Sequence, residues 1–265
     1  MSRAVQLTPT ATWWPSVLWQ TTTLEVVRGG ERLLVDPGIA PWEVREAAGD
    51  VAHNLLITHA DWDHVMGIGL LPDACVHASP GAAERIRSGR ARSEVESETR
   101  PYGLPLEGLD GLRVDRLLPE SGGETTIGSF AAVCHPAPGH TPDGFAVLLP
   151  EEGLLIAGDH LSLQEVPFIQ HSAWRYLDTL HMLTAVIERD GPALVVIGHG
   201  PPQPGDAALR VAAEDIAYVE ALIRYAEAGG SPDSPQDVPH PHRGSDDEVE
   251  HAGNLRRTCE ALAAR

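Results

Sequence analysis

The chain has 265 residues, with 38 acidic against 19 basic side chains and a formal net charge of −19. Such a negative surface repels phosphate backbones, so the charge disfavours broad nucleic-acid binding. No apolar run approaches the roughly 20 residues that a membrane span needs, and the first residues lack the apolar segment of a secretory signal. We therefore expect a cytoplasmic globular protein that has no membrane partner.

The first half of the chain alternates predicted strands with short helices. Runs rich in β-branched residues and bounded by glycine or proline predict strands, and apolar spacings of three or four residues predict helices. The strands are expected at 17–20, 22–27, 32–35, 55–58 and 74–77, and the helices at 42–48, 65–71 and 80–86. Residues 88–111 mix serine, arginine, glutamate, proline and glycine, which predicts a loop or an insertion.

The second half repeats this alternation with longer helices. Strands are expected at 112–118, 124–127, 130–135, 145–149, 154–157 and 193–197, and helices at 174–189, 207–228 and 247–264. Two strand-rich halves that each carry helices predict an α/β fold with sheets packed face to face and helices outside. We expect one domain over 1–228, with 229–265 as an accessory flexible connection and C-terminal helix.

The segment from His59 to His64 carries the most chemistry. It places two imidazoles (His59, His64) and two carboxylates (Asp61, Asp63) within six residues, directly after the apolar strand at 55–58. The rigid end of a strand holds such a loop still, and alternating side chains can point to two neighbouring metal positions. Neutral imidazole and carboxylate are ligands that suit zinc, iron and manganese.

Three later segments share one pattern, in which a glycine and a metal-ligating residue follow a strand. They centre on His140 in Pro-Gly-His-Thr, Asp159 in Ala-Gly-Asp-His and His199 in Ile-Gly-His-Gly. A glycine beside each ligand lets the backbone approach a crowded centre. Any one of these residues alone would more often be a structural polar residue, but the ordered set predicts a metal site.

This ordered set resembles the metallo-β-lactamase superfamily. The family pattern is His-x-His-x-Asp-His, then a histidine in a PGHT-like turn, a bridging aspartate and a final histidine. The chain matches this pattern, in order, at His59, Asp63, His64, His140, Asp159 and His199. The turn Asp36-Pro37-Gly38 also resembles an early strand-end turn of the family, so the resemblance spans roughly residues 17–201.

The resemblance implies a four-layer αββα sandwich with two divalent metal ions at one edge. By analogy the first ion takes His59, Asp61 and His140, and the second takes Asp63, His64 and His199. Asp159 bridges the two ions, and together with Asp63 it would orient the nucleophile.

Asp61 departs from the common pattern, since most family members carry histidine there. Flavodiiron proteins carry glutamate at this position, and competence-type DNA-uptake proteins carry aspartate. A third carboxylate favours iron or manganese over zinc if Asp61 binds directly. Because aspartate is shorter than histidine, the alternative is that Asp61 only hydrogen-bonds a ligand.

The resemblance implies a metal-dependent hydrolase that uses a metal-bridged hydroxide on a small-molecule substrate. A small ester, thioester or lactone is the first hypothesis, and a small phosphodiester is the second. A non-heme iron oxidoreductase is a further alternative, although no Gly-rich flavin loop is visible. A metal-bearing fold that serves only as a binding module is disfavoured, because all seven positions keep ligand atoms.

The C-terminal segment leaves two questions open. His240 and His242 are candidates for adventitious metal binding, but a solvated loop is the simpler interpretation. The last helix is expected either near the mouth of the active site or on a partner subunit of a homodimer, and a helix that only caps its own domain is equally compatible with the sequence.

Overall fold

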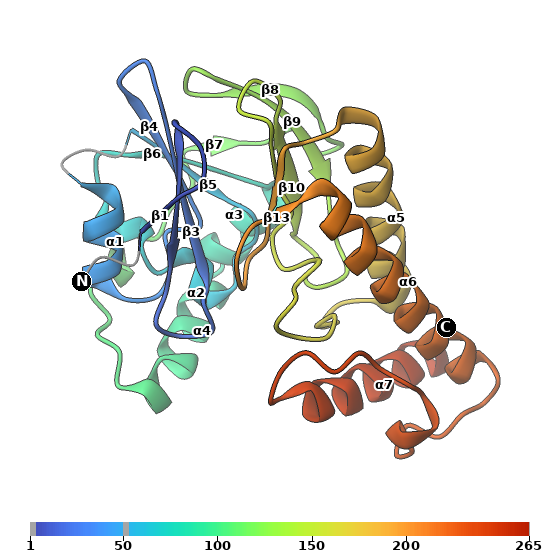
Figure 1. Ribbon diagram of the computed structural model, residues 1–265. Coiled ribbons are helices and arrows are strands. Elements are labelled where there is room, and N and C mark those ends of the chain that lie inside the picture. Colours follow the sequence, from blue (N-terminus) through green and yellow to red (C-terminus); the bar gives the residue numbers. More distant parts are fainter. Residues whose placement is uncertain (1–3, 50–52, 265) are drawn as a thin grey trace.

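The computed structural model describes residues 4–49 and 53–264. Within these ranges two β-sheets pack face to face, and helices cover the outer face of each sheet (Figure 1). The expected four-layer αββα sandwich is therefore confirmed. No helix in the described ranges is long and apolar enough to cross a membrane.

The first sheet contains the N-terminal strands in chain order. Strands β1 to β4 pair antiparallel, and β4 to β7 pair parallel. The strands are β1 (Val5–Gln6), β2 (Ala11–Pro15), β3 (Thr22–Arg28), β4 (Glu31–Val35), β5 (Asn54–Ile57), β6 (Cys75–Ala78) and β7 (Arg116–Leu117). Because β4, β5 and β6 are parallel, their carboxyl ends meet at one edge of the sheet.

The second sheet has the order β13-β12-β11-β10-β9-β8. Only β11 and β12 pair parallel, and the other neighbours in this part of the described chain are antiparallel. The strands are β8 (Gly123–Ile127), β9 (Phe130–Pro136), β10 (Phe145–Leu149), β11 (Leu154–Ile156), β12 (Leu194–Val196) and β13 (Gln203–Pro204). The loops that follow β11 and β12 therefore leave the sheet side by side.

Short helices cover the first sheet and long helices cover the second. The first group is α1 (Pro41–Ala48), α2 (Trp62–Val65), α3 (Pro80–Arg87) and α4 (Arg90–Glu98), with 3₁₀ turns η1 (Ile68–Leu70), η2 (Arg100–Tyr102) and η3 (Leu109–Gly111). The second group is α5 (Ala173–Asp190), α6 (Gly205–Glu227) and α7 (Asp247–Ala263), with η4 (Pro235–Asp237) before α7. Helix α7 lies at the end of the sandwich, packed on α6 (Figure 1).

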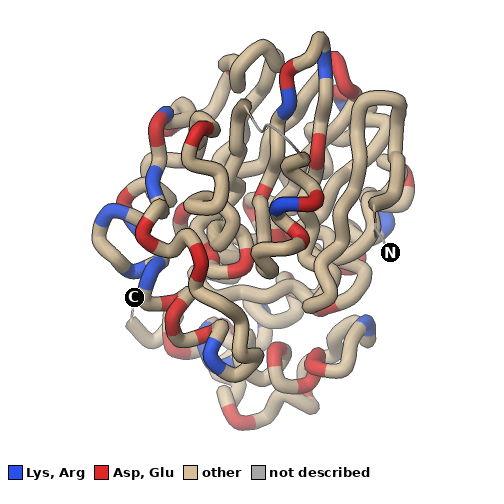
Figure 2. Tube along the Cα trace, turned by 90° about the vertical axis from the view of Figure 1, so that its left-hand side faces the viewer, with Lys and Arg blue, Asp and Glu red and all other residues tan. Residues whose placement is uncertain are grey.

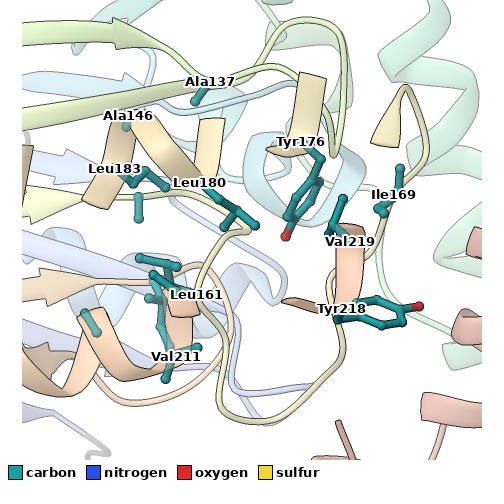
Figure 3. Packing of buried hydrophobic residues seen from close by; sticks show 14 of the residues in the cluster. Ala137, Ala146, Leu161, Ile169, Tyr176, Leu180, Leu183, Val211, Tyr218 and Val219 are labelled. Carbon is teal, nitrogen blue, oxygen red and sulfur yellow. The ribbon is translucent and has the colours of Figure 1, made fainter. Parts of the chain in front are cut away.

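Three apolar layers hold the sandwich together. One lies between the sheets and joins Leu24 and Leu56 to Phe130 and Leu149, and a second packs the first sheet on its helices. The third packs the second sheet on α5 and α6, where Figure 3 shows Leu180 and Tyr176 of α5 beside residues of α6. Burial of each large aliphatic side chain contributes about 1.5–3 kcal/mol.

Two expected elements near the first sheet are replaced by other structure. Residues 17–20 form a turn, in which Trp19 and Gln20 both have a φ of 50°, and the strand partner of β3 is β2 instead. In place of the helix expected over 65–71, the structure has α2, which lies earlier and ends at Val65, and the 3₁₀ turn η1. The reason is local, since the Gly67 amide donates to the carbonyl of Pro37 at 2.7 Å rather than continuing the helix.

The segment 88–111 is not a simple loop. It contains α4, η2 and η3, and α4 buries Ala91 and Val95 against the first sheet's helices. Helix α4 consists mainly of charged residues and serine, and it buries only Ala91 and Val95. Its sequence therefore lacks the repeated apolar spacing that predicts a helix. The strand expected over 112–118 is shortened to β7, because only residues 116 and 117 pair with β6.

Candidate metal centre

The seven predicted ligands lie together at one edge of the sandwich. The loop after β5 contributes His59 and Asp61, and helix α2, which follows it, contributes Asp63 and His64. The loops after β9, β11 and β12 contribute His140, Asp159 and His199. Segments far apart in the sequence thus converge because the strands that precede them end at the same edge. The described part of the chain therefore brings the whole predicted set together.

One group of ligand atoms comes from His59, Asp61 and His140. Asp61 Oδ2 lies 3.2 Å from His140 Nε2 and 3.8 Å from His59 Nε2. Asp159 Oδ2 lies 3.3 Å from His140 Nε2 and 3.5 Å from His59 Nε2. Donors around one ion with bonds of about 2.0–2.1 Å are separated by about 3.3 Å in a tetrahedron. These spacings suit one metal ion, and Asp61 reaches the position despite its short side chain.

A second group comes from Asp63, His64 and His199. Asp63 Oδ2 lies 3.6 Å from His64 Nε2 and 3.5 Å from His199 Nε2. Asp159 again completes the group, with Oδ1 at 3.2 Å from His64 Nε2 and Oδ2 at 3.2 Å from His199 Nε2. Asp159 therefore faces both groups, as a bridging ligand must.

Four of the atoms that could bind metal in this centre have no hydrogen-bond partner among the described residues. They are Nε2 of His59, His64 and His140 and Oδ1 of Asp159, and all four are buried. A buried polar atom left unpaired costs about 1–3 kcal/mol, so four in one place need a common partner. A pair of divalent cations fits this donor set, because imidazole nitrogen and carboxylate oxygen are both metal ligands.

The opposite nitrogen of each histidine ring lies close to a carboxylate, a carbonyl or a hydroxyl. Asp36 Oδ2 lies 3.0 Å from His64 Nδ1, and the Phe168 carbonyl lies 2.7 Å from His140 Nδ1. Thr58 and Thr21 hydroxyls lie 3.0 Å from His59 Nδ1 and 3.3 Å from His199 Nδ1. Such partners fix the ring orientation and aim Nε2 at the centre.

Asp36 has a wider structural role than a strand-end turn. Its carboxylate accepts hydrogen bonds from the Thr58 amide at 2.8 Å and the Thr58 hydroxyl at 2.7 Å. Asp36 therefore connects the end of β4 to the loop that carries His59 and to the His64 ring. The sequence showed this residue only as part of a turn motif.

Arg85 is a residue that the sequence did not indicate. It lies on α3, where Nη2 donates to Asp61 Oδ1 at 2.8 Å and Nη1 donates to Asp143 Oδ1 at 2.8 Å. The other Asp143 oxygen accepts from the Ala60 amide at 2.8 Å. Arg85 thus occupies one oxygen of Asp61 and leaves the other facing the metal group. The only sequence signal is Asp143 itself, three residues after His140.

The buried carboxylates and imidazoles of the centre shift one another's pKa values. Burial opposes ionisation of Asp61, but contact with His140 and the nearby charges of His59 and Arg85 hold its pKa well below the ordinary value. Burial also opposes protonation of the histidines, yet the carboxylates of Asp61 and Asp159 raise the pKa of His140 to about 9. Metal ions therefore displace protons when they bind.

Two glycines are required by the close packing of the centre. A Cβ atom on Gly198 would lie 1.8 Å from Asp159 Oδ1 and 3.2 Å from the His64 ring. Gly139, with a φ of 138°, has the backbone of Tyr176 within 2.3 Å of a Cβ position. The glycines beside the ligands thus admit the backbone where a side chain would collide.

The centre opens into a cavity of about 1050 Å³ whose walls are mainly acidic and aromatic. Among the described residues, nine carboxylates and two guanidinium groups line it. Figure 2 shows that acidic positions outnumber basic ones along the chain. The carboxylates belong to Asp61, Asp63, Glu94, Glu98, Asp159, Glu165, Asp246, Asp247 and Glu250. Residues of α7 and of the loop before it form one wall, so the C-terminal segment borders the site.

A family model described as the metallo-beta-lactamase superfamily matches residues 17–199. The chain belongs to the metallo-beta-lactamase superfamily. This assignment agrees with the two-sheet architecture and the clustered His and Asp residues, so the chain is a metallo-hydrolase of this fold. The family match ends at the last ligand, and it does not include the C-terminal segment that borders the cavity.

Comparisons with individual proteins give one relative in sequence and support the fold. An uncharacterized Bacillus subtilis (strain 168) protein, YobT, is 28% identical over 166 residues, which cover 57% of this chain and 69% of that protein. A metallo-beta-lactamase family protein from Thermus thermophilus is 18% identical with a TM-score of 0.68, over 98% of this chain and 95% of that one.

A second solved structure shares the fold over nearly all of this chain. The stereoselective inverting sec-alkylsulfatase of a Pseudomonas species is 13% identical with a TM-score of 0.73. The similarity covers 98% of this chain but 50% of the sulfatase. At these identities the comparison establishes the common architecture and leaves the substrate open.

Proposed function

We propose that this metallo-hydrolase cleaves a small, uncharged or positively charged ester, thioester or lactone. The observation that carries the substrate class is the charge of the cavity, in which the described carboxylates outnumber guanidinium groups by nine to two. An anionic phosphodiester or sulfate would meet repulsion from cavity carboxylates outside the metal-ligand set, including Glu98 and Asp246. An ester or lactone carries no such charge.

The two guanidinium groups do not reverse this balance. Arg243 lies 2.7 Å from Asp215 and 3.0 Å from Glu214, so its charge is already compensated. Arg257 donates to the Asn254 side chain and lies over the Phe168 ring at 5.5 Å. Its single charge is outnumbered by the carboxylates that line the cavity.

Two metal ions would be held by the two groups of ligands that share Asp159. When bound, such ions polarise the carbonyl oxygen of the substrate and increase the acidity of a coordinated water. The third carboxylate, Asp61, favours a harder ion in the first group, although Arg85 withdraws part of its charge. Iron or manganese is therefore the proposed content of that group.

Asp63 and Asp159 are the proposed catalytic carboxylates. Asp63 Oδ2 accepts from the Thr21 hydroxyl at 3.2 Å, which fixes it between His64 and His199. Asp159 is positioned by the loop after β11 so that Oδ1 lies near His64 and Oδ2 lies near both His140 and His199. Carboxylates held in this way can orient a water molecule and accept its proton.

Aromatic side chains provide an apolar surface for the acyl or alcohol part of the substrate. Trp19 and Trp62 line the cavity and pack edge to face with ring centroids 5.5 Å apart. Tyr102 extends this cluster, at 5.3 Å from Trp19. A small hydrophobic group can be buried here while the scissile carbonyl reaches the metal groups.

A substrate panel on protein reconstituted with zinc, manganese or iron tests the proposal. The panel contains a p-nitrophenyl ester, a γ-lactone, a thioester, bis-p-nitrophenyl phosphate and an alkyl sulfate. We expect turnover of the first three classes, with a preference for substrates that carry an ammonium group over matched carboxylates. Faster cleavage of the phosphodiester or sulfate would overturn the substrate class, and redox turnover without hydrolysis would favour the iron oxidoreductase alternative.

A further inference from the structure

A second group of metal-ligating side chains lies outside the centre, at the start of the C-terminal helix. His240 and His242 belong to the segment between η4 and α7, and Glu248 belongs to the first turn of α7. One donor atom of each residue lies within 4.8 Å of the others. His240 Nε2 and Glu248 Oε1 are 3.6 Å apart.

The ring of His240 is buried, and one of its nitrogen atoms lacks a hydrogen-bond partner among the described residues. Its side chain is only 8% exposed, and its Nε2 atom is buried without a hydrogen-bond partner among the described residues. Its ring stacks on His251 at 4.3 Å with an interplanar angle of 16°. A buried imidazole nitrogen that points at a carboxylate beyond hydrogen-bond distance lacks one partner.

His251 supports this arrangement and is not itself available as a ligand. Its Nδ1 lies 2.9 Å from the Tyr218 hydroxyl, and its Nε2 lies 2.9 Å from the Pro235 carbonyl. Both nitrogens are therefore occupied. The His251 ring provides a flat surface that fixes the orientation of His240, and His242 packs edge to face against His240 at 4.5 Å.

We propose that His240, His242 and Glu248 bind a further transition-metal ion of the zinc type, separate from the two-metal centre. The donor set is two imidazoles and one carboxylate, a combination that suits zinc. Ligand atoms around tetrahedral zinc are separated by about 3.3 Å, which is close to the 3.6 Å between His240 and Glu248. His242 and Glu248 are exposed, so small side-chain rotations close the remaining distances. Glu248 provides the negative charge that compensates part of the charge of the ion.

The site would close a loop that borders the catalytic cavity. His242 and Glu248 flank residues 243–247, and all five residues of this loop line the cavity. The loop is already tied internally, since Asp247 accepts from the Gly244 amide at 2.8 Å. A metal ion shared by the residues on either side would join both ends of the loop and keep this wall in place.

The proposal is tested by the difference in zinc content between variants, which does not depend on the state of the catalytic centre. Wild type, His242→Ala, Glu248→Gln and the control His181→Ala are dialysed against the same micromolar free zinc, and the bound metal is measured per chain. His181 is an exposed histidine of α5 outside the cluster. We expect both cluster variants to hold one ion fewer than wild type and the control.

Cobalt(II) provides an independent spectroscopic measurement. Titration of protein whose catalytic centre is already loaded should give a d–d band with a stoichiometry of one, and each cluster variant should weaken this binding by at least about tenfold. Equal metal content in wild type and His242→Ala, or an equal loss in His181→Ala, would overturn the proposal. The exposed ligands are substituted first because His240→Ala removes a buried ring and also threatens the fold.

Discussion

Arg85 and Asp61 form an ion pair that is almost completely shielded from water, with 11% and 12% of their side chains exposed and 2.8 Å between Nη2 and Oδ1. The two oxygens of the Asp61 carboxylate therefore have different neighbours. Oδ1 is held by the guanidinium, and Oδ2 faces His140 at 3.2 Å. An aspartate is thereby held at the position where the family pattern has a histidine.

Replacement of Arg85 should therefore disturb the first metal group without touching a ligand. We expect Arg85→Gln to lower metal occupancy and turnover by about 10–100-fold, the range for residues that orient ligands. Elemental analysis and initial rates measure both effects. Arg87→Ala, on the same helix but exposed and paired with Glu84, is the control. Unaltered metal content in Arg85→Gln would show that Asp61 needs no such support.

Asp61→His restores the common family residue. We expect the variant, offered equal zinc and manganese, to shift toward zinc by about tenfold, because imidazole is the softer donor. The loss of negative charge should also move the acidic limb of the pH–rate profile to lower pH. Asp61→Asn serves as control for charge alone. If neither the preference nor the acidic limb changes, Asp61 is not a ligand.

Asp159 faces both ligand groups, so its removal should affect both ions. We expect Asp159→Ala to lose both ions of the centre and to lower turnover more than about 100-fold while the chain stays folded. The exposed Asp178→Ala is the control, and circular dichroism reports the fold. Chelation of the wild type should lower its melting temperature, and added metal should restore it. Two ions retained in Asp159→Ala would refute its bridging position.

Glu250 predicts a pH dependence of stability. Burial and the neighbouring Glu165, Asp247 and Asp246 raise its pKa to about 8, against about 4.3 in an unfolded chain. The folded chain holds this proton more tightly, so the contribution to stability is full below the unfolded pKa and is lost as the pH rises through about 8.

Glu250→Gln cannot lose that proton. In metal-free protein, we expect its melting temperature relative to wild type to be higher at pH 9 than at pH 5. Glu260→Gln, exposed on the same helix, should show no such change. A constant difference between the Glu250 variant and wild type across this range would contradict the proposed cause.

Asn254 joins α7 to the loop that carries Phe168. Its side chain is fully buried, donates to the Pro167 carbonyl at 2.6 Å and accepts from the Ile169 amide at 2.9 Å. Asn254→Ala leaves both backbone groups unpaired, and we expect a loss of about 2 kcal/mol in urea unfolding. Arg256→Ala, exposed on α7, should be close to neutral. A small loss in Asn254→Ala would indicate that α7 is only loosely attached.

The sequence by itself determined the architecture and the position of each ligand along the chain. Strand patterns and strand-end glycines predicted where most strands lie and where the ligand-bearing loops begin. Local patterns suffice here because each of these loops follows directly from a strand, and parallel strands deliver their ends to one edge. The resemblance to the family assigned His59 and Asp159 to one site although 100 residues separate them.

The tertiary structure alone decided what surrounds those ligands. Arg85 reaches Asp61 from α3, whose sequence gives no sign of this contact, and α4 lies in a segment whose composition resembles a loop. The acidic cavity wall depends on how α7 packs, and the cluster at His240 exists because His251 and Glu248 fold back beside it. These contacts join side chains of different helices and loops. The spacing of residues along the chain does not indicate how close such side chains lie in the folded protein.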